Sequence, residues 1–378
     1  MCNHTPFCSI IPPHILRHIS ENATGALKQS AFRALLLSQS MRARRSTLAE
    51  LGIAAQPVGE LNRTVYDAQE TEDSTPHGVI VRREGDGPTT DVAVNQAYDS
   101  AGDTYNFYDQ IFQRNSIDNK GMRLDSYVHY GKQFDNAFWD GKEMVYGDGD
   151  GVIFNRFTVD LDVIAHELTH GVTAYEADLA YSGQSGALNE SISDVFGTMV
   201  KQWKLKQAAK DADWLIGAHL LEPSINGKAL RSMANPGTAY DDPQLGGKDP
   251  QPATMAGYQK LPNSEDNGGV HINSGIPNHA FYLACMKIDQ NGFSWEKPGT
   301  IWYLTLTTRL NTNSNFQDCA NATYSVAGEQ FGSGSLEQQA IADAWNEVGI
   351  QVEEPGSVKV KKHKTTPHSK HPKKKMAG

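Results

Sequence analysis

The stretch from Leu161 to Tyr175 constrains the fold of this chain more than any other part of the sequence. Its apolar residues recur at every third or fourth position, which predicts an amphipathic helix. His166 and His170 are four residues apart on that helix, so both imidazoles project from one face and can bind the same Zn²⁺. Glu167 is next to His166, close enough to act on a water at the metal without being a ligand. A surface helix with two unrelated histidines is the alternative.

A second helical pattern, from Leu188 to Trp203, favours the metal site. It places Glu190 and Asp194 on one face, away from the apolar positions. Glu190 is suited to be the third zinc ligand, which would leave a fourth position open for water. Asp194, one turn further on, is suited to accept an N–H from a ligating histidine and so to fix its tautomer. The alternative is that both are solvated acids on a helix surface. The nearby histidine pair makes this alternative the weaker interpretation.

Composition excludes several classes of protein. The chain has 378 residues, 39% of them hydrophobic, and four scattered cysteines, which is typical of a globular protein of two or three domains and not of a disulfide-rich or disordered one. No window approaches the ~18 consecutive apolar residues of a membrane span. Residues 1–20 lack the basic start and the apolar stretch of a signal peptide.

The charges are unevenly distributed along the chain, whose formal net charge is −10. Residues 356–378 contain eight lysines and no acid, and residues 1–47 contain six basic residues and one Glu. The segment between them holds 20 basic and 43 acidic residues, so we expect no nucleic acid at the core. The tail over 351–378 is predicted to be disordered, either as a solvated tail or as an arm that binds polyanions.

The order of secondary-structure signals predicts an α+β protein. Residues 58–157 are rich in β-forming residues broken by Asn, Asp and Gly, and the chain beyond residue 160 turns helical. Residues 1–47 form a first unit, in which a Pro-Pro turn precedes a helix. Strands are expected around Arg63–Tyr66, Gly78–Arg82 and Val152–Phe157, and further helices over 91–112, 275–288, 296–310, 316–331 and 335–348.

Six short motifs occur together across roughly residues 60–350: Asn136–Trp139, Met144–Gly151, His166–His170, Gly186–Asp194, Leu230–Met233 and Asp266–Gly275. In their order and spacing they resemble the thermolysin-like zinc metallopeptidases. The resemblance implies a two-lobed fold, with a β-rich N-terminal lobe over 51–175 that includes the zinc helix and a mainly helical C-terminal lobe over 176–350. The zinc helix lies between the two lobes.

Spacing separates this chain from other families that share the histidine motif. Nineteen residues lie between His170 and Glu190, whereas the zinc aminopeptidases have eighteen, and their Gly-x-Met-Glu-Asn motif is absent. Metzincins need a Gly and a third His where this chain has Thr173 and Glu176. The resemblance therefore implies a zinc-dependent metalloendopeptidase. Two alternatives are a catalytically inactive relative that acts as a binding module, and a zinc-dependent scaffold.

The resemblance assigns further catalytic roles by position. Glu167 would take a proton from the water that zinc activates and hand it to the departing amine. His271 matches the histidine that donates to the tetrahedral oxyanion, with Asp266 orienting it. Tyr181, eleven residues after His170, matches a second donor to the same oxygen. These donors would stabilise negative charge where it develops.

Substrate-binding residues are implied in the same way. Asn136 and the backbone of Ala137 match the edge strand to which an extended substrate adds, and Arg231 matches the residue that holds the carbonyl on the leaving-group side. Six apolar side chains match the pocket for the residue after the scissile bond, which predicts a broad preference for a bulky apolar residue there. They are Phe154, Phe157, Val163, Ile216, Leu220 and Leu230.

The N-terminal unit, with its Pro12-Pro13-His-Ile-Leu16 segment, resembles the compact propeptide of the protealysin-like branch. We therefore expect residues 1–50 to be an intramolecular inhibitor of a latent precursor, packed against the cleft with Pro12 and Pro13 near the zinc. Proline suits this place because it lacks the N–H that strand addition uses. Removal is expected at or after Arg42–Arg45. Cys8 is a weaker candidate for a fourth zinc ligand.

The expected partners are protein and peptide substrates and the chain's own propeptide. We expect a monomer that does not associate with membranes. The family resemblance implies secretion, and a cytoplasmic location is the alternative because the first residues lack the features of a signal peptide.

One departure from the family pattern concerns calcium. In calcium-rich relatives, carboxylates beside the zinc helix build a double calcium site, but here only Asp162 and Asp213 keep a carboxylate at those positions. Lys201 puts a cation there instead, so an Asp162–Lys201 ion pair is expected to replace the metal. The sequence leaves a single calcium elsewhere undecided. The other two positions hold Leu215 and Ala218.

Overall fold

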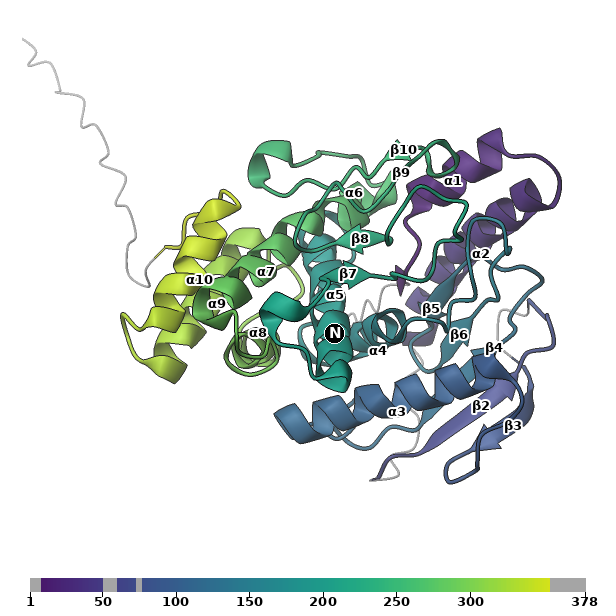
Figure 1. The fold of residues 1–378 in the computed structure, drawn as a ribbon, viewed down its shortest axis with the longest axis horizontal. Helices are drawn as coiled ribbons and strands as arrows, with labels where there is room; N and C mark the ends of the chain where they lie inside the picture. The colour runs from purple at the N-terminus through teal and green to yellow at the C-terminus, as the bar shows by residue number, and fades with distance from the viewer. Residues whose placement is uncertain (1–7, 50–59, 73–76, 354–378) are drawn as a thin grey trace, which may run out of the picture.

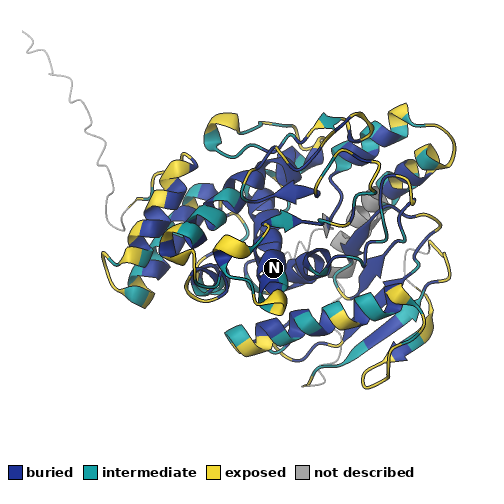
Figure 2. Cartoon of the chain, in the orientation of Figure 1, coloured by how far each residue is buried: buried dark blue, intermediate teal, exposed yellow. Residues whose placement is uncertain are grey.

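Two long helices, α4 (Leu161–Glu176) and α5 (Gly183–Leu205), cross the middle of the molecule and separate a sheet-bearing lobe from a helical lobe (Figure 1). The computed structural model describes residues 8–49, 60–72 and 77–353, without the side chains of Cys8 and of residues 38–49. Every residue of α4 from Asp162 to Thr173 is buried, and α5 is buried over most of its length (Figure 2). The predicted helices that carry the metal ligands are therefore at the core.

Close packing brings these two helices together at a glycine. A Cβ on Gly197 of α5 would lie only 2.6 Å from the backbone oxygen of Asp162 on α4, so a larger side chain there would push the helices apart. The short distance between the helix backbones allows side chains from both to reach one point.

The N-terminal lobe is built on a six-stranded sheet with the strand order β1-β5-β6-β4-β2-β3. Helix α3 (Val92–Phe112) packs against β2 and β4, and its N-cap Asp91 accepts backbone N–H groups of the first turn. Strands β2, β4 and β6 pair in parallel, whereas β1, β5 and β3 are antiparallel to their neighbours. The strands are β1 (Cys8–Ser9), β2 (Arg63–Asp67), β3 (Val79–Arg83), β4 (Leu124–Val128), β5 (Ala137–Trp139) and β6 (Met144–Tyr146).

The C-terminal lobe is mainly helical, as predicted. Short strand pairs and turns over residues 209–258 precede the helices, and none of the helices in the described ranges is long and apolar enough to cross a membrane. The helices are α6 (Asp266–Asn273), α7 (Gly275–Asp289), α8 (Lys297–Thr308), α9 (Phe316–Phe331) and α10 (Leu336–Glu347). The strand pairs are β7 (Leu215–Ile216) with β8 (Arg231–Ser232), and β9 (Asp241–Asp242) with β10 (Gly247–Lys248).

The predicted strands around Arg63–Tyr66 and Gly78–Arg82 are confirmed, but the one at Val152–Phe157 is wrong. That segment forms turns and a single bridge between Phe154 and Leu221. Asp150 explains the difference, because its Oδ1 accepts the N–H groups of three successive residues, 152 to 154, at 2.7 to 3.1 Å. A backbone curled around one carboxylate cannot extend into a strand.

The N-terminal unit has one more helix than the sequence predicts. Pro12 and Pro13, predicted to form a turn, instead begin helix α1 (Pro13–Asn22), because proline at the first helical position loses no hydrogen bond. Helix α2 (Gly25–Ala49) follows and packs against α1. Arg42–Arg45, the expected cleavage region, lies within α2, where side chains are not described. The lysine-rich tail beyond residue 353 lies outside the described residues.

The predicted Asp162–Lys201 ion pair is present. The ammonium nitrogen of Lys201 lies 2.7 Å from Asp162 Oδ2 and 2.9 Å from Asp213 Oδ1, and it donates to the carbonyl of Leu215 at 2.6 Å. Asp162 is fully buried, and its Oδ1 accepts the N–H of Gly217 at 3.2 Å. One lysine therefore ties α4, α5 and the segment before β7 together.

Replacing Lys201 by Met should lower the free energy of unfolding by about 3–5 kcal/mol, because the buried carboxylate of Asp162 loses its counter-charge. Lys204→Met is the matched control on the same helix, since it removes a pair with Asp103 in which the lysine is about half exposed, and it should cost about 0.2–1 kcal/mol. Urea unfolding of both variants measures the difference. Adding Asp162→Asn to Lys201→Met should restore part of the loss, and equal small losses for the two lysine variants would contradict the prediction.

Candidate active site

Helix α4 presents His166 and His170 on one face, as the sequence predicts. Their Nε2 atoms are 3.0 Å apart, and both side chains are buried. The four-residue spacing places them one turn apart on the same helix face, with their rings nearly perpendicular, and both contact Glu190 of α5. Two imidazole nitrogens this close together are suited to bind one metal ion.

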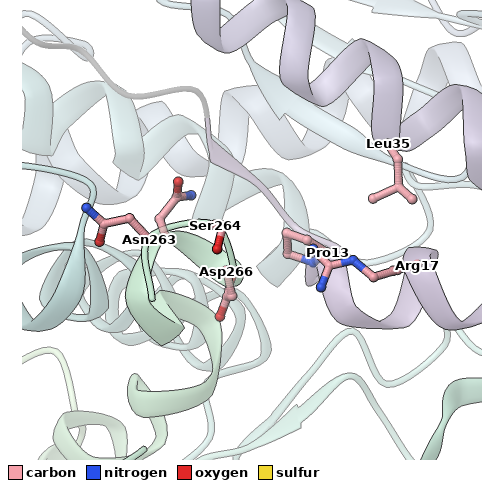
Figure 3. A pocket seen from close by; sticks show the side chains of 7 residues that line it. Pro13, Arg17, Leu35, Asn263, Ser264 and Asp266 are labelled. Carbon is pink, nitrogen blue, oxygen red and sulfur yellow. The ribbon is translucent and has the colours of Figure 1, made fainter. Parts of the chain in front are cut away.

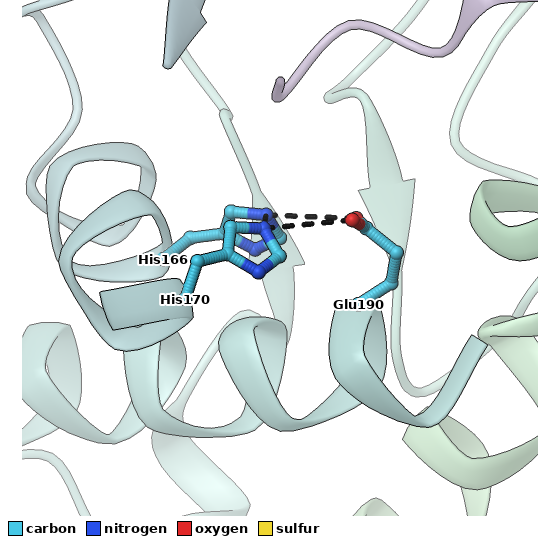
Figure 4. A group of neighbouring side chains, drawn as sticks. All are labelled: His166, His170 and Glu190. Atoms are coloured by element: carbon cyan, nitrogen blue, oxygen red, sulfur yellow. Dashed lines mark hydrogen bonds and ion pairs between the residues drawn. The ribbon is translucent and has the colours of Figure 1, made fainter. Parts of the chain in front are cut away.

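Glu190 on α5 completes the group (Figure 4). Its Oε2 lies 3.6 Å from His166 Nε2 and its Oε1 lies 3.5 Å from His170 Nε2. These three residues form the only group of three or more potential ligands found in the described part of the chain. The Oε2 of Glu190 is buried and accepts no hydrogen bond from the described residues. Two nitrogens and one carboxylate fit the donor set of a catalytic zinc site with an open fourth position.

A second layer of hydrogen bonds orients the two histidines. His166 Nδ1 is 2.8 Å from Asp194 Oδ1, as expected from the sequence. His170 Nδ1 is 2.8 Å from Asn189 Oδ1 and 3.0 Å from the hydroxyl of Ser193, two partners that the sequence did not predict. Each ligating histidine needs a partner on its other nitrogen, and the sequence supplied a partner for only one of the two. The missing partner of His170 was therefore the one indication in the sequence that a further residue such as Asn189 supports the site.

The carboxylate of Asp194 binds three side chains, those of His166, Arg231 and Asn278. Arg231 donates to both of its oxygens, Nε to Oδ2 and Nη2 to Oδ1, each at 2.8 Å, and Asn278 Nδ2 donates to Oδ2 at 2.8 Å. Burial by itself favours the neutral acid, but Arg231 and His166 outweigh it and hold the pKa of Asp194 below its usual range. The position of Arg231 thus depends on Asp194, a contact that the sequence did not predict.

Glu167 lies on the side of α4 that faces the sheet. Its side chain is fully buried, and Oε2 accepts the N–H of Trp139 on β5 at 3.2 Å. The carboxylate is therefore held between the histidine pair and the edge of the sheet, next to the metal group without belonging to it.

His271 and Tyr181 also contact Glu190. His271 Nε2 is 3.2 Å from the Tyr181 hydroxyl and 3.5 Å from Glu190 Oε2, and the Tyr181 hydroxyl donates to Glu190 Oε1. Asp266 Oδ1 lies 2.5 Å from His271 Nδ1, and its Oδ2 accepts the His271 N–H at 2.9 Å. Burial lowers the pKa of His271, but Glu190 and Asp266 outweigh burial and raise it to about 9.

The backbone before His271 is held in an unusual conformation. Asp266, Asn267, Gly268 and Gly269 all have φ between 48° and 86°. Asp and Asn tolerate this left-handed region and glycine favours it, so the sequence Asp-Asn-Gly-Gly can make a tight reversal that L-residues with larger side chains resist. The reversal brings the carboxylate of Asp266 to Nδ1 and to the backbone N–H of His271.

The N-terminal segment lies against this site. Strand β1 pairs antiparallel with β5, with Cys8 opposite Trp139 and Ser9 opposite Phe138. The prediction that the N-terminal unit packs at the site is thus confirmed, but Cys8–Ile11 form the contacts with the edge strand, not the two prolines. A proline has no N–H to donate to the edge strand, and Pro12 and Pro13 form the start of α1. The side chain of Cys8, and with it the proposed fourth ligand, lies outside the described residues.

A cavity of about 230 Å³ marks the junction of the N-terminal unit with the body (Figure 3). Side chains from α1 and α2 line one side of it, and residues of the loop that leads to His271 line the other. Basic Arg17 thus faces acidic Asp266 across the cavity, in keeping with a basic unit on an acidic body. The lining includes Pro13, Arg17 and Leu35 on one side and Asn263, Ser264 and Asp266 on the other.

The six residues predicted to form the pocket are all buried, and they belong to one hydrophobic cluster. The rings of Phe154 and Phe157 are 6.0 Å apart, and Leu230 N donates to Ile216 O at 3.0 Å. Their role as a specificity pocket stays a prediction.

A sheet-bearing lobe and a helical lobe that meet at a buried His-His-Glu group, with a further glutamate beside it, define a zinc metallopeptidase. Family models agree: the thermolysin metallopeptidase catalytic domain matches residues 57–174, and the thermolysin metallopeptidase alpha-helical domain matches residues 177–350. The chain belongs to the thermolysin family of metallopeptidases and is a metalloendopeptidase.

Similar proteins cover nearly the whole chain. An extracellular metalloprotease of Pectobacterium carotovorum subsp. carotovorum is 49% identical over 348 residues, which are 92% of this chain and 97% of that protein. Protease PrtS of Photorhabdus sp. is 47% identical over 350 residues, 91% and 92% of the two chains. The structure of the precursor of protealysin, a metalloproteinase from Serratia proteamaculans, superimposes with a TM-score of 0.81 at 49% identity and covers 91% of this chain and 99% of its own.

Replacing Asn189 by Ala should weaken zinc binding roughly 10- to 100-fold, because His170 loses the oxygen that fixes its ring and tautomer. Competition with a chromogenic zinc chelator measures the affinity. Thr198→Ala is the matched control, since Thr198 is also a buried polar residue of α5, but it accepts from Gln202 two turns beyond the ligands. Equal zinc affinities for the two variants would show that Asn189 does not support the metal site.

Proposed function

We propose that this metalloendopeptidase is made as a latent precursor and cuts internal peptide bonds before bulky apolar residues, using zinc. One observation carries the proposal. An extended segment of the chain pairs antiparallel with β5, directly beside the His166, His170 and Glu190 group. An edge strand that accepts a peptide next to a metal-ligand group is the arrangement that peptide hydrolysis needs.

The side chains divide the work of hydrolysis. Zinc held by the two histidines and Glu190 would act as a Lewis acid and lower the pKa of a water molecule. Glu167 lies between this group and β5, so it is placed to take a proton from the water and to pass it to the departing amine. His271 and Tyr181 contact each other, and His271 lies near Glu190. Both would donate hydrogen bonds to the carbonyl oxygen of the scissile bond, on which negative charge develops.

Substrate positioning is assigned to three residues. Asn136 and the backbone of Ala137 would hold an extended peptide along the edge of the sheet. Arg231 would hold the carbonyl of the residue after the scissile bond, and its bidentate pair with Asp194 keeps it in one position. The apolar cluster around Phe154, Phe157, Val163, Ile216, Leu220 and Leu230 supports a preference for Leu, Phe, Ile or Val at that residue.

Cleavage of a peptide library by the truncated, zinc-loaded enzyme tests this function. Mass spectrometry of both products should place a bulky apolar residue directly after most cut bonds. Glu167→Gln should lose roughly 10²- to 10⁴-fold in rate, since a general base is removed, while zinc stays bound. Unchanged function in Glu167→Gln would favour the scaffold alternative, and zinc binding without any cleavage by the unmodified enzyme would favour a binding module.

We propose that residues 1–50 inhibit the enzyme until they are removed. The backbone of Cys8–Ile11 occupies the edge strand that a substrate would use, and His271 and Arg231 already bind carbonyl groups of Ser9 and Ile10. Positively charged α1 and α2 lie on an acidic body, which favours docking. The similar solved structure from Serratia proteamaculans is that of a precursor, which supports the proposal.

Purified protein that retains residues 1–50 should be roughly 10²-fold or more less active on a peptide than the form that starts near residue 51, because a tethered occupant competes at millimolar effective concentration. Initial rates at equal zinc loading measure the difference. Equal activities would show that the N-terminal unit does not inhibit.

We propose that the enzyme has no double calcium site beside α4. Lys201 contacts Asp162 and Asp213, the two carboxylates that remain at the expected positions, and a lysine ammonium there repels a divalent cation. A calcium-selective chelator should therefore change the melting temperature little while zinc stays bound. A large fall in melting temperature, or two calcium ions beside Asp162 in a crystal, would contradict this. A single calcium ion bound elsewhere would not contradict it.

We propose that the protein acts outside the cell, as a monomer. The similar protein from Pectobacterium carotovorum subsp. carotovorum is an extracellular metalloprotease, which supports this location. Finding the active form in the culture medium of intact cells, and not only after lysis, tests it.

A further inference from the structure

The N-terminal segment binds the site in a definite register. His271 Nε2 lies 3.0 Å from the carbonyl oxygen of Ser9, and Arg231 Nη1 donates to the carbonyl oxygen of Ile10 at 3.1 Å. His271 is the residue placed to donate to the carbonyl under attack, and Arg231 the one placed to hold the next carbonyl along the chain. The peptide bond between these two carbonyls is Ser9–Ile10.

The backbone N–H groups fix the same register. Ile10 N donates to Ala137 O at 3.3 Å, and Ile11 N donates to Asn136 Oδ1 at 3.2 Å. These bonds continue the antiparallel pairing of β1 with β5 past Ser9, so the segment runs along the edge strand in a single direction without a break. Four independent contacts thus place Ser9 before the scissile position and Ile10 after it.

The side chain after that bond has the required chemistry. Ile10 is fully buried, and it is part of the continuous hydrophobic core that extends through both lobes and includes the six residues of the proposed specificity pocket. A β-branched apolar side chain follows the bond at the position where this pocket favours one. Pro12 and Pro13 then take the chain out of the strand and into α1.

We infer that the Ser9–Ile10 bond occupies the scissile position and that the chain hydrolyses it at its own site, so that the N-terminal segment is a tethered substrate as well as an inhibitor. This inference rests on the proposed function. Water adds its oxygen to the carbonyl carbon of Ser9, the C–N bond breaks, and a proton passes to the nitrogen of Ile10. The products are a peptide of residues 1–9 that ends in a carboxylate and a chain that begins with the amine of Ile10.

The geometry also explains why such a cut would be slow to activate the enzyme. After hydrolysis, Arg231 and Asn136 still hold Ile10 and Ile11, and α1 and α2 keep the new amine beside the site. The tethered amine can re-form the bond or block the next substrate. Loss of residues 1–9 removes the pairing of β1 with β5 and the contact of Ser9 with His271, which loosens the segment for its later removal.

The test starts with full-length protein purified without metal and then loaded with zinc. Intact mass spectrometry and N-terminal sequencing over time should detect a chain that begins at Ile10. Its first-order rate should be unchanged over a tenfold dilution, since the reaction is intramolecular. Glu167→Gln should yield none of this product, and in that variant the amides of Ile10 and Ile11 should exchange slowly with deuterium when zinc is bound.

A pair of substitutions at one position tests the register. Ile10→Leu keeps a bulky apolar side chain and should keep the cut, whereas Ile10→Asn should slow it roughly tenfold or more. The truncated enzyme is assayed in parallel on a separate peptide. This assay distinguishes failure of the Ser9–Ile10 inference from failure of the proposed function. If that enzyme is active but no chain starting at Ile10 forms, or the cut falls at a neighbouring bond, the inference is overturned alone. If the truncated enzyme is inactive as well, both the inference and the proposed function fail.

Discussion

The buried carboxylate of Asp194 is the interaction on which the rest of the site depends. It fixes the ring of His166, it holds Arg231 by two hydrogen bonds, and it accepts a third donor from Asn278 on α7. A buried carboxylate is stable only when its charge and lone pairs are matched, and here all the partners come from different elements. The same group therefore orients a metal ligand and positions the residue that grips the peptide. Loss of Asp194 would disturb metal binding and peptide binding together.

The second constraint is the side of β5 that faces away from β6, which β1 covers in this structure. An edge strand offers unpaired backbone groups, and β5 is where a peptide can add beside the metal group. The N-terminal segment pairs with that strand, so under the proposed function one structural feature accounts for both substrate binding and latency. The segment pairs through its backbone and presents Ile10 to the hydrophobic cluster, which is what an ordinary substrate would do. In the proposed latent precursor, the tether and α1 and α2 behind it would supply the inhibition, since a free peptide with the same contacts would leave after being cut.

Stability beside the metal helix is organised around one lysine. Lys201 on α5 contacts two carboxylates and a backbone carbonyl, which belong to α4 and to residues 213–215. A covalently attached cation is present at every concentration of free metal, whereas a calcium site is filled only by mass action. If the proposed absence of a double calcium site holds, Lys201 keeps the helix pair together at any calcium concentration.

The sequence by itself determined the features that depend on local spacing. The ligands His166, His170 and Glu190, the helices that carry them and the four C-terminal helices from 275 to 348 follow from periodicity, because a helix repeats every 3.6 residues whatever surrounds it. The Asp162–Lys201 pair followed from charges at matching positions. Tertiary structure decided what depends on contacts between distant segments: the partner of His170, the clamp of Arg231 on Asp194, the turns that replace a strand at Val152–Phe157, and the residues of the N-terminal unit that enter the site. Proline pairs suit turns and helix starts equally well, and only the edge of β5, more than a hundred residues away, selected Cys8–Ile11 to pair with it.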